Sequence, residues 1–435
     1  MKKLSYYWSE LKSSFWFIPV LIIILAVALA ILFLFIDSQV KISESIQGYF
    51  FISNPSSARV VLSTISAAMI GVAGTVFSII LVVLTLTSNQ FGSRLIKNFM
   101  YIKLNQVVLG SYVSTFAYCL IILSAITENE LIIFVPTFSI ILAIITAIAN
   151  IILLIIFIHN VATSIQAENV IADISESLSM NLQTLFPETM GEEVEEEEEE
   201  ELDEVLIKRE YKEKLVFHSL KSGYLRYINT EALFGIAMEL DVLIEIYFRP
   251  GHYIVKDSEI GLIYSNNILD EEVIKRIQTQ FNLGKSRTQQ QDAEHAIHQM
   301  VEIADRALSP GINDPYTAIA CIDNLTSTMC FLANAKIPSR YRFDSESKLR
   351  VITDVLTYEG MLDAAFNQIR QYAKGNPSVI IRLMEALLTI SKFTKQSKHK
   401  KIIRKHAIML LNVAEQSIEE QNDLKDFKER SKLII

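Results

Sequence analysis

The sequence predicts a membrane protein in which four transmembrane α-helices are followed by a cytoplasmic α+β region. Four long apolar stretches lie within the first 160 residues, and the remaining 275 residues have the composition of a water-soluble, charged domain. In this second part, short β-prone runs precede long helical patterns. We therefore expect a small β module followed by a helical domain, and this part is large enough to bury a core of its own.

Each apolar stretch is long enough to cross a hydrocarbon core of about 30 Å. The four stretches are Trp16–Ile36, Val60–Thr87, Val107–Ile126 and Leu131–Ile158. None of them contains Asp, Glu, Lys or Arg. The lipid bilayer is therefore the first expected partner of this chain.

The basic residues near the spans predict which ends face the cytoplasm, because cytoplasmic loops retain positive charge. These residues are Lys2, Lys3 and Lys12 before the first span, and Arg94, Lys97 and Lys103 between the second and third. We expect a multi-pass protein of the bacterial plasma or inner membrane with both termini in the cytoplasm. A cleaved signal peptide is the alternative for the N-terminus, but its apolar run is longer than a typical signal core.

The net charge of −9 comes from one segment. Eleven acids lie between Glu192 and Glu204, and removing eleven negative charges from −9 leaves +2. A block of like charges repels itself, so we expect a hydrated linker, with binding of cations or a basic partner as the alternative. The scattered cysteines Cys119, Cys321 and Cys330 form no metal spacing and indicate a reducing compartment.

These patterns divide the chain into five parts. They are a transmembrane domain (1–160), a helical stalk with the acidic linker (161–214), a small β module (215–268), a helical cytoplasmic domain (269–420) and a tail (421–435). The strands are expected at Leu215–Leu220, Tyr224–Ile228, Val242–Phe248, Tyr253–Lys256 and Ile260–Tyr264, with a helical insert at Glu231–Glu239. Helices are expected after Asp270 and at Thr288–Leu308, Pro315–Asn334, Ser345–Ala373, Pro377–Lys395 and Lys401–Glu420.

A row of polar side chains lies opposite the apolar face of the helix expected over Thr288–Leu308. The row consists of Glu294, His298, Glu302 and Asp305. Carboxylates and imidazoles can ligate a divalent metal, although the tight His-Glu-x-x-His arrangement is absent. A solvated helix face with pH-sensitive ion pairs explains the row as well.

The segment that follows predicts a rigid corner between two helices. Pro310 and Gly311 end one helix, and Asp314 with Pro315 begins the next. Asn313 and Asp314 are the candidates here for contact with a ligand or a neighbouring subunit.

Small and hydroxyl-bearing residues recur along the second span. They are Ser63, Ser66, Ala67, Gly71, Gly74, Thr75 and Ser78. Such residues let helix backbones approach closely, and they can also line a narrow wet path. Helix packing and a pore lining are both open at this point.

Three segments resemble a bacterial membrane protein family known as domain of unknown function 2254. They are Phe77–Ile79 with Ser88–Phe91 and Arg94, then Arg249–Gly251, and then Leu308–Pro315. The resemblance extends over roughly residues 10–390 and implies an integral membrane protein with no established activity; it adds Arg249 and Gly251 as candidate ligand or subunit contacts. This chain departs from the family at Ser93, usually proline, and at His252, usually aspartate, which weakens a ligand role for that turn. The β module also resembles a biotinyl- or lipoyl-type barrel in shape, without a lysine in the modification setting.

Two functions follow from these observations. The first is an oligomeric passive channel or conduit that is gated by the cytoplasmic domain. The second is a membrane-anchored sensor or scaffold whose cytoplasmic domain binds a ligand or protein partner. An enzyme that uses the polar row of 294–305 with a metal ranks third, because no phosphate-binding loop, nucleophile elbow or zinc motif is present. We expect no cofactor and no nucleic-acid partner.

Overall fold

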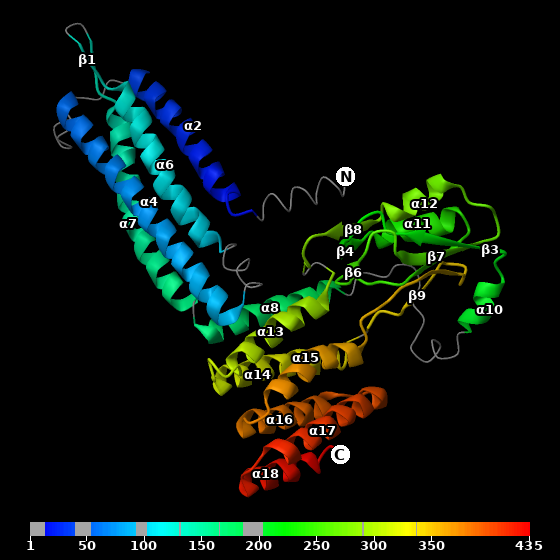
Figure 1. Ribbon diagram of the computed structural model, residues 1–435. Coiled ribbons are helices and arrows are strands. Elements are labelled where there is room, and N and C mark those ends of the chain that lie inside the picture. Colours follow the sequence, from blue (N-terminus) through cyan, green and yellow to red (C-terminus); the bar gives the residue numbers. More distant parts are fainter. Residues whose placement is uncertain are drawn as a thin grey trace. The chain divides into compact units, whose positions relative to one another are not determined.

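The computed structural model describes residues 14–39, 54–92, 102–129, 132–164, 166–185, 203–288, 291–335 and 337–435. It divides into two compact units, one ending at Asn169 and one beginning at Val170 (Figure 1). Most of the acidic linker and the basic residues 2, 3, 12, 94 and 97 lie outside the described residues.

The first unit contains four helices whose length and composition allow them to cross a membrane. They are α2 (Phe17–Gln39), α4 (Pro55–Phe91), α6 (Lys103–Ala125) and α7 (Thr137–Ser164). The four predicted spans are thus confirmed as long apolar helices. Helix α4 has 37 residues because Asn54 caps its start, accepting from the Ser56 amide at 3.1 Å, and Gly92 ends it. Its length of about 55 Å exceeds a hydrocarbon core.

The start of the fourth span differs from the prediction. Residues 127–129 and 132–134 pair as a hairpin of β1 (Thr127–Asn129) and β2 (Ile132–Phe134), and α7 begins only at Thr137. Asp37 of α2 fixes this start, because its carboxylate accepts from the amides of Phe138 and Ser139 at 2.9 and 3.0 Å. These are amides of the first turn of α7, which have no partner within the helix.

Helix α6 is the centre of the first unit and packs against α2, α4 and α7. A Cβ added to Gly110 would lie 2.9 Å from Pro19 Cα, so this glycine lets α2 approach closely. Asn150 of α7, 1% exposed, joins α7 to α6: its amide nitrogen donates to Thr115 Oγ1 at 2.9 Å, and its amide oxygen accepts from Ser111 Oγ at 2.5 Å. The bundle therefore has a paired polar cluster in its interior.

The second unit contains two sheets. Its strands are β3 (Glu213–His218), β4 (Gly223–Ile228), β5 (Leu243–Ile246), β6 (Tyr253–Ile254), β7 (Glu259–Ser265), β8 (Phe281–Gly284), β9 (Tyr341–Phe343) and β10 (Leu349–Ile352). One sheet has the order β3-β7-β5-β10-β9 and the other β6-β4-β8. Among the described residues neither sheet closes on itself, so the barrel-like form is not confirmed.

Three strands lie in the part that was predicted to be helical. They are β8, β9 and β10, and β10 pairs in parallel with β5. The helix predicted over Ser345–Ala373 is therefore wrong in its first part, and α15 covers only Tyr358–Tyr372. The strand state of β10 is decided by its partner, which lies about a hundred residues earlier in the chain.

The main core of the second unit lies between the two sheets and two short helices, α11 (Thr230–Glu239) and α12 (Glu271–Gln278). Ile244 and Ile246 of β5 enter this core, while Leu243 faces a smaller cluster on the other side of the sheet. Helix α10 (Glu204–Arg209) contributes Ile207 to that smaller cluster. The strand β5 is therefore buried on both faces, as its nearly continuous apolar sequence requires.

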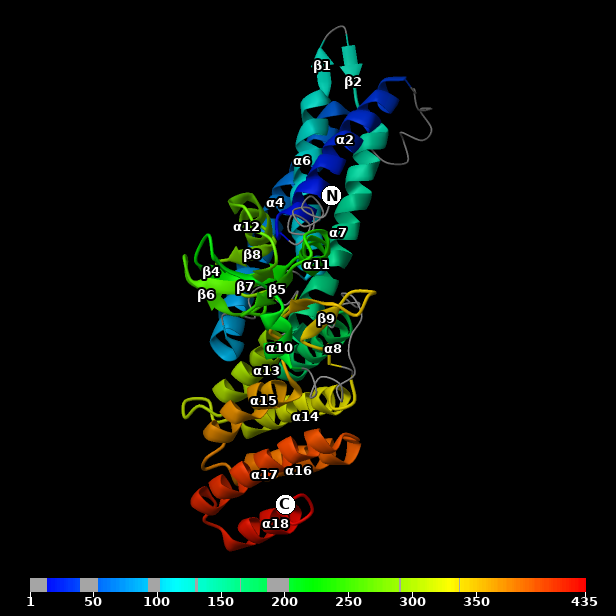
Figure 2. The same cartoon turned by 90° about the vertical axis from the view of Figure 1, so that its right-hand side faces the viewer.

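The rest of the second unit is helical. The helices are α8 (Ala167–Leu185), α13 (Ala293–Ala307), α14 (Pro315–Leu332), α15, α16 (Pro377–Phe393), α17 (Ser397–Ser417) and α18 (Gln421–Ser431). Helix α14 packs between α13 and α16, and α17 and α18 pack on α16 (Figure 2). Residues 421–431, expected in a tail, form α18. The expected continuous stalk is divided, because α7 ends at Ser164 and α8 begins at Ala167.

Candidate functional site

A cavity of about 140 Å³ lies within the second unit, where the sheets meet the start of α13. Its wall contains Ile228 and Thr230 after β4, the turn residues Arg249 and Pro250, residues 291–294, residues 353–356, and Pro338 with Arg342. The wall thus combines apolar side chains with two guanidinium groups and three carboxylates. Small-molecule sites commonly have this mixture of apolar walls and a few polar groups.

The turn at 249–252 places Arg249 at the cavity. Gly251 has a φ of +101°, which L-residues rarely adopt, and its amide donates to the Leu225 carbonyl at 2.8 Å. A Cβ on Gly251 would lie 2.5 Å from Asp292 Oδ2 and 2.9 Å from Arg287 Nη2. Glycine is therefore required at 251 by the backbone and by the neighbouring ion pair.

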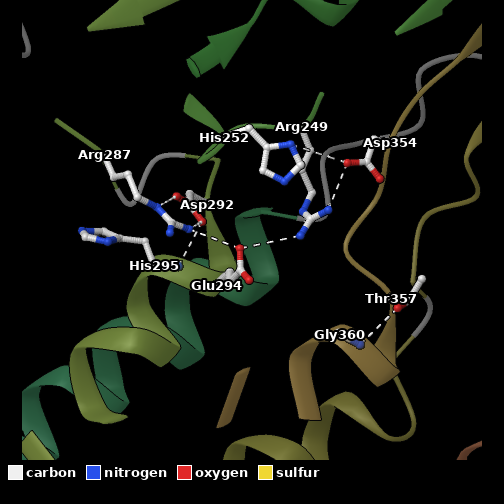
Figure 3. A network of polar contacts seen from close by, with 9 residues as sticks. All are labelled: Arg249, His252, Arg287, Asp292, Glu294, His295, Asp354, Thr357 and Gly360. Atoms are coloured by element: carbon white, nitrogen blue, oxygen red, sulfur yellow. Dashed lines mark hydrogen bonds and ion pairs between the residues drawn. The ribbon is translucent and has the colours of Figure 1, made fainter. Parts of the chain in front are cut away.

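Arg249 bridges two carboxylates from different parts of the chain (Figure 3). Its Nη1 donates to Asp354 Oδ2 at 3.0 Å, and its Nη2 lies 3.6 Å from Glu294 Oε2. Asp354 lies in the connection from β10 to α15, which ends where Thr357 caps α15. Arg249 thereby joins the turn, the start of α13 and the connection before α15.

A second arginine, Arg287, also contacts Glu294, and it pairs with Asp292 as well. Arg287 donates from Nε and Nη2 to the two oxygens of Asp292 at 2.7 and 2.8 Å, and its Nη2 lies 3.3 Å from Glu294 Oε2. Asp292 is 3% exposed and caps α13 by accepting from the His295 amide at 2.9 Å. This bidentate, buried pair fixes the start of α13 beside the cavity.

His252 and Arg342 complete the charged groups near the cavity. The Nδ1 of His252 lies 3.9 Å from Asp354 Oδ2, and its ring meets Phe248 edge to face. Burial, together with the nearby Arg249 guanidinium, lowers the pKa of His252, so the imidazole is neutral at pH 7. Arg342 of β9 is buried and donates to the Tyr341 carbonyl at 3.2 Å.

The polar row of α13 is divided by the structure. Glu294 joins the cavity network, whereas Glu302 forms an ion pair with Arg306 at 3.7 Å. Among the described residues, no group of three or more His, Cys, Asp or Glu side chains is placed to hold a metal ion. Burial, reinforced by the charge of Glu302, raises the pKa of Asp305 to about 7.

Asn313 and Asp314 do not belong to the cavity wall. Asp314 caps α14, accepting from the Thr317 amide at 3.1 Å and from the Thr317 hydroxyl at 2.6 Å, which confirms the predicted start of this helix. Asn313 has a φ of +51° and is exposed beside Tyr316, which is 81% exposed. In the corner between α13 and α14, Asp314 therefore serves to cap the helix, whereas Asn313 is exposed at the surface.

The small residues of α4 mostly face away from the helix bundle. Ser66 is buried within it, while Ser63, Ala67, Gly71, Gly74, Thr75 and Ser78 are exposed on the single chain. A Cβ added to Gly71 or Gly74 would meet nothing within 4 Å. The hydroxyls of Ser63, Thr75 and Ser78 donate to carbonyls of their own helix.

Arg249, Gly251 and Glu294 of this network were predicted from the sequence, whereas Arg287, Asp292, Arg342 and Asp354 were not. Asp292 carries a local signal, since an aspartate before an apolar helical pattern is a capping residue. The sequence around Asp354 contains no such local signal, because Asp354 approaches Arg249 only in the folded chain.

These features define a class of protein: a membrane protein with four candidate spanning helices followed by a unit of mixed helices and sheets. Residues 12–389 match the model of the family described as predicted membrane protein DUF2254. The chain belongs to this family, as the three sequence segments had indicated.

Curated relatives of this chain carry no described activity. An uncharacterised protein of Mycobacterium bovis is 27% identical over 391 residues, covering 88% of this chain and 73% of the relative. Uncharacterised proteins of two strains of Mycobacterium tuberculosis match with the same identity and coverage. No solved structure matches this chain.

Proposed function

We propose that this chain is a membrane-anchored sensor that binds a small ligand in the cavity at Arg249. The observation that carries the proposal is that one arginine at the cavity wall joins three segments, through Glu294 of α13 and Asp354 before α15. A ligand that competes for this arginine changes the contact between the sheets and the helices. The sensing unit lies in the cytoplasm, anchored in a bacterial inner membrane, and no catalytic role is proposed.

The composition of the wall indicates the ligand class. The two guanidinium groups of Arg249 and Arg342 suit a carboxylate or phosphate group, while Pro250, Val355 and Leu356 suit a small apolar body. The ligand's anionic group replaces one carboxylate at Arg249. Since the displaced Glu294 or Asp354 then faces solvent or a ligand donor, the tie between α13 and α15 weakens.

A fragment screen tests this proposal. The full-length chain in nanodiscs is exposed to small carboxylates, phosphates, amines and neutral fragments, and binding is measured by ligand-observed NMR. Ala293→Phe fills the cavity, and Gly235→Phe adds the same ring on α11, where a Cβ meets nothing within 4 Å. We expect anionic fragments to bind the wild type and Gly235→Phe, but not Ala293→Phe.

Arg249→Gln tests the charge in the same screen. It should weaken anionic fragments at least tenfold, on the order of 1.4 kcal/mol, and leave neutral ones nearly unchanged. Fragments that bind Ala293→Phe as well as the wild type would place the ligand elsewhere. A loss that is equal for anionic and neutral fragments would contradict the role of Arg249.

A conduit is the second candidate, favoured by the exposed small residues of α4. In this reading, several copies place Gly71 and Gly74 around a path. The hydroxyls of Ser63, Thr75 and Ser78 already bond to their own helix, so they need no water and are compatible with lipid or helix contact. Because these hydroxyls already have hydrogen-bond partners, we rank the conduit below the sensor. Liposomes that hold the purified chain and pass ions or small solutes would reverse the order.

A further inference from the structure

The end of α16 and the first half of α17 carry a dense positive charge. Seven cations lie between residues 392 and 405, and this stretch contains no Asp or Glu. They are Lys392, Lys395, Lys398, Lys400, Lys401, Arg404 and Lys405, all of them exposed, and we call them the basic face. The face contrasts with the net charge of −9 for the whole chain.

Within the described residues, part of the basic face is paired with a neighbouring helix and part of it is not. Lys405 pairs with Glu359 of α15 at 2.8 Å. Within the stretches that the structure describes, Lys400, Lys401 and Arg404 have no carboxylate within 4 Å. The inner side of α17 is held by buried residues instead, such as His399, which stacks on Tyr358 at 4.1 Å. The cations therefore point outward from a firmly packed helix.

The position of the lysines along α17 adds to the positive potential. Helix α17 begins at Ser397, so Lys398 and Lys400 lie in its first turn, and Gln396 provides no side-chain cap. The first turn of a helix is its positive end, where cations are unfavourable and anions are favourable. An anionic group at this place is favourable beside Lys400 and the positive end of the helix.

Two apolar side chains lie within the same surface. Phe393 is 62% exposed and Ile408 is 42% exposed. Cations interspersed with exposed aromatic and aliphatic side chains are typical of protein surfaces that rest on an anionic bilayer.

We propose that the basic face binds the headgroups of anionic phospholipids. The phosphates lie against Lys400, Lys401 and Arg404, and Phe393 enters the interfacial region. The face is separate from the cavity at Arg249, so the proposal is independent of the ligand proposed there.

The test uses the full-length chain in nanodiscs of phosphatidylcholine alone or with added phosphatidylglycerol. Hydrogen exchange is measured for peptides that cover residues 392–408. We expect several-fold slower exchange in the anionic discs at low salt, and the difference should disappear at high salt because the contact is electrostatic. Quenching of Phe393→Trp by lipids with brominated acyl chains should increase in the same anionic discs.

A matched pair of triple variants separates the face from net charge. Lys400→Gln, Lys401→Gln and Arg404→Gln should abolish the lipid-dependent protection. Lys374→Gln, Lys425→Gln and Lys432→Gln change the net charge equally, on exposed positions outside the face, and should preserve it.

Three outcomes overturn the proposal. The first is equal exchange in both kinds of disc, and the second is protection that survives in the variant at 400, 401 and 404. The third is protection that is already present in neutral discs and is lost when Glu195–Glu201 are changed to Gln, since the occupant is then the acidic segment of the chain itself.

Discussion

At the residue scale, Asp305 is the member of the polar row on α13 whose carboxyl responds most strongly to burial. Its Oδ1 is buried, and within the described part of the chain it makes no hydrogen bond. Burial, with the charge of Glu302, raises its pKa to about 7. A proton therefore neutralises this carboxyl at mildly acidic pH.

Asp305→Asn should stabilise the protein at alkaline pH. The pKa of Asp305 is about 7 in the folded protein and near 3.9 in the unfolded chain. The stability that protonated Asp305 contributes is therefore complete below about pH 3.9 and is lost as the pH rises through about 7. Asparagine carries no charge to bury, so its melting temperature should exceed that of the wild type by several degrees at pH 8 and by little at pH 5. Thermal unfolding in detergent with a chelator measures this difference.

The exposed Asp257 provides the control. Asp257→Asn should shift both melting temperatures by less than about one degree, as surface substitutions usually do. If Asp305→Asn destabilises the protein at pH 8, or if a chelator lowers the melting temperature of the wild type, the carboxylate form is the one that the fold requires.

The cavity also shows what residue patterns can predict. Arg249 and Gly251 were identified through the resemblance to the family, and Asp292 has a capping position that a residue pattern can indicate. Asp354 and Arg342 lie about a hundred residues further on and reach the cavity through β9 and β10. A single sequence contains no local signal for such a long-range contact.

At the scale of elements, apolar length predicted the four spans, but local patterns misjudged short segments. Leu349–Ile352 is a run of four residues, too short to tell a strand from a helix. The strand Ile132–Phe134 was hidden because it is as apolar as the span that follows. Asn150 was passed over, since one polar residue hardly changes the mean hydropathy of α7.

Asn150→Leu should weaken the contact between α6 and α7. It leaves Ser111 and Thr115 without their partner inside the bundle, at a cost of about 1 kcal/mol or somewhat more. Unfolding of the full-length chain in mixed micelles of increasing SDS content measures the loss. Ser124→Ala on the exposed side of α6 removes a hydroxyl that bonds only to its own helix and should change stability little.

If Ser124→Ala lowers the stability as much as Asn150→Leu does, the hydrogen bonds of Asn150 contribute no more to the stability of the bundle than a hydroxyl bonded to its own helix. The polar cluster would also be dispensable if Asn150→Leu were more stable than the wild type.

At the scale of the whole molecule, we propose that a second copy, if the protein assembles, contacts the outer face of α4. Ser63, Gly71 and Ser78 share this face, and on the single chain they are exposed. Leucine at these positions fits a lipid-facing surface but prevents close approach of another backbone. Whether the protein assembles is therefore separable from whether each chain folds.

The triple variant Ser63→Leu, Gly71→Leu, Ser78→Leu should keep the stability of the single chain and reduce the mass of the assembly. Mass photometry in nanodiscs or native mass spectrometry measures the number of copies, and circular dichroism follows the helices. Ile151→Leu on the exposed part of α7 is the control and should leave the mass unchanged. An unaltered mass in the triple variant would exclude this face as the contact.

The parallel pairing of β10 with β5 sets the order in which the second unit is assembled. Ile244 of β5 pairs with Val351 of β10. More than one hundred residues must therefore leave the ribosome after Ile244 before this pairing can form and complete the strand order. Until then β5 presents an open edge of strongly apolar sequence, which is the kind of edge that recruits other chains. A truncation at residue 268, which looks natural from the sequence, would leave that edge open permanently. We expect such a fragment to aggregate, while one that extends through β10 and the helices packed behind it has its sheet complete.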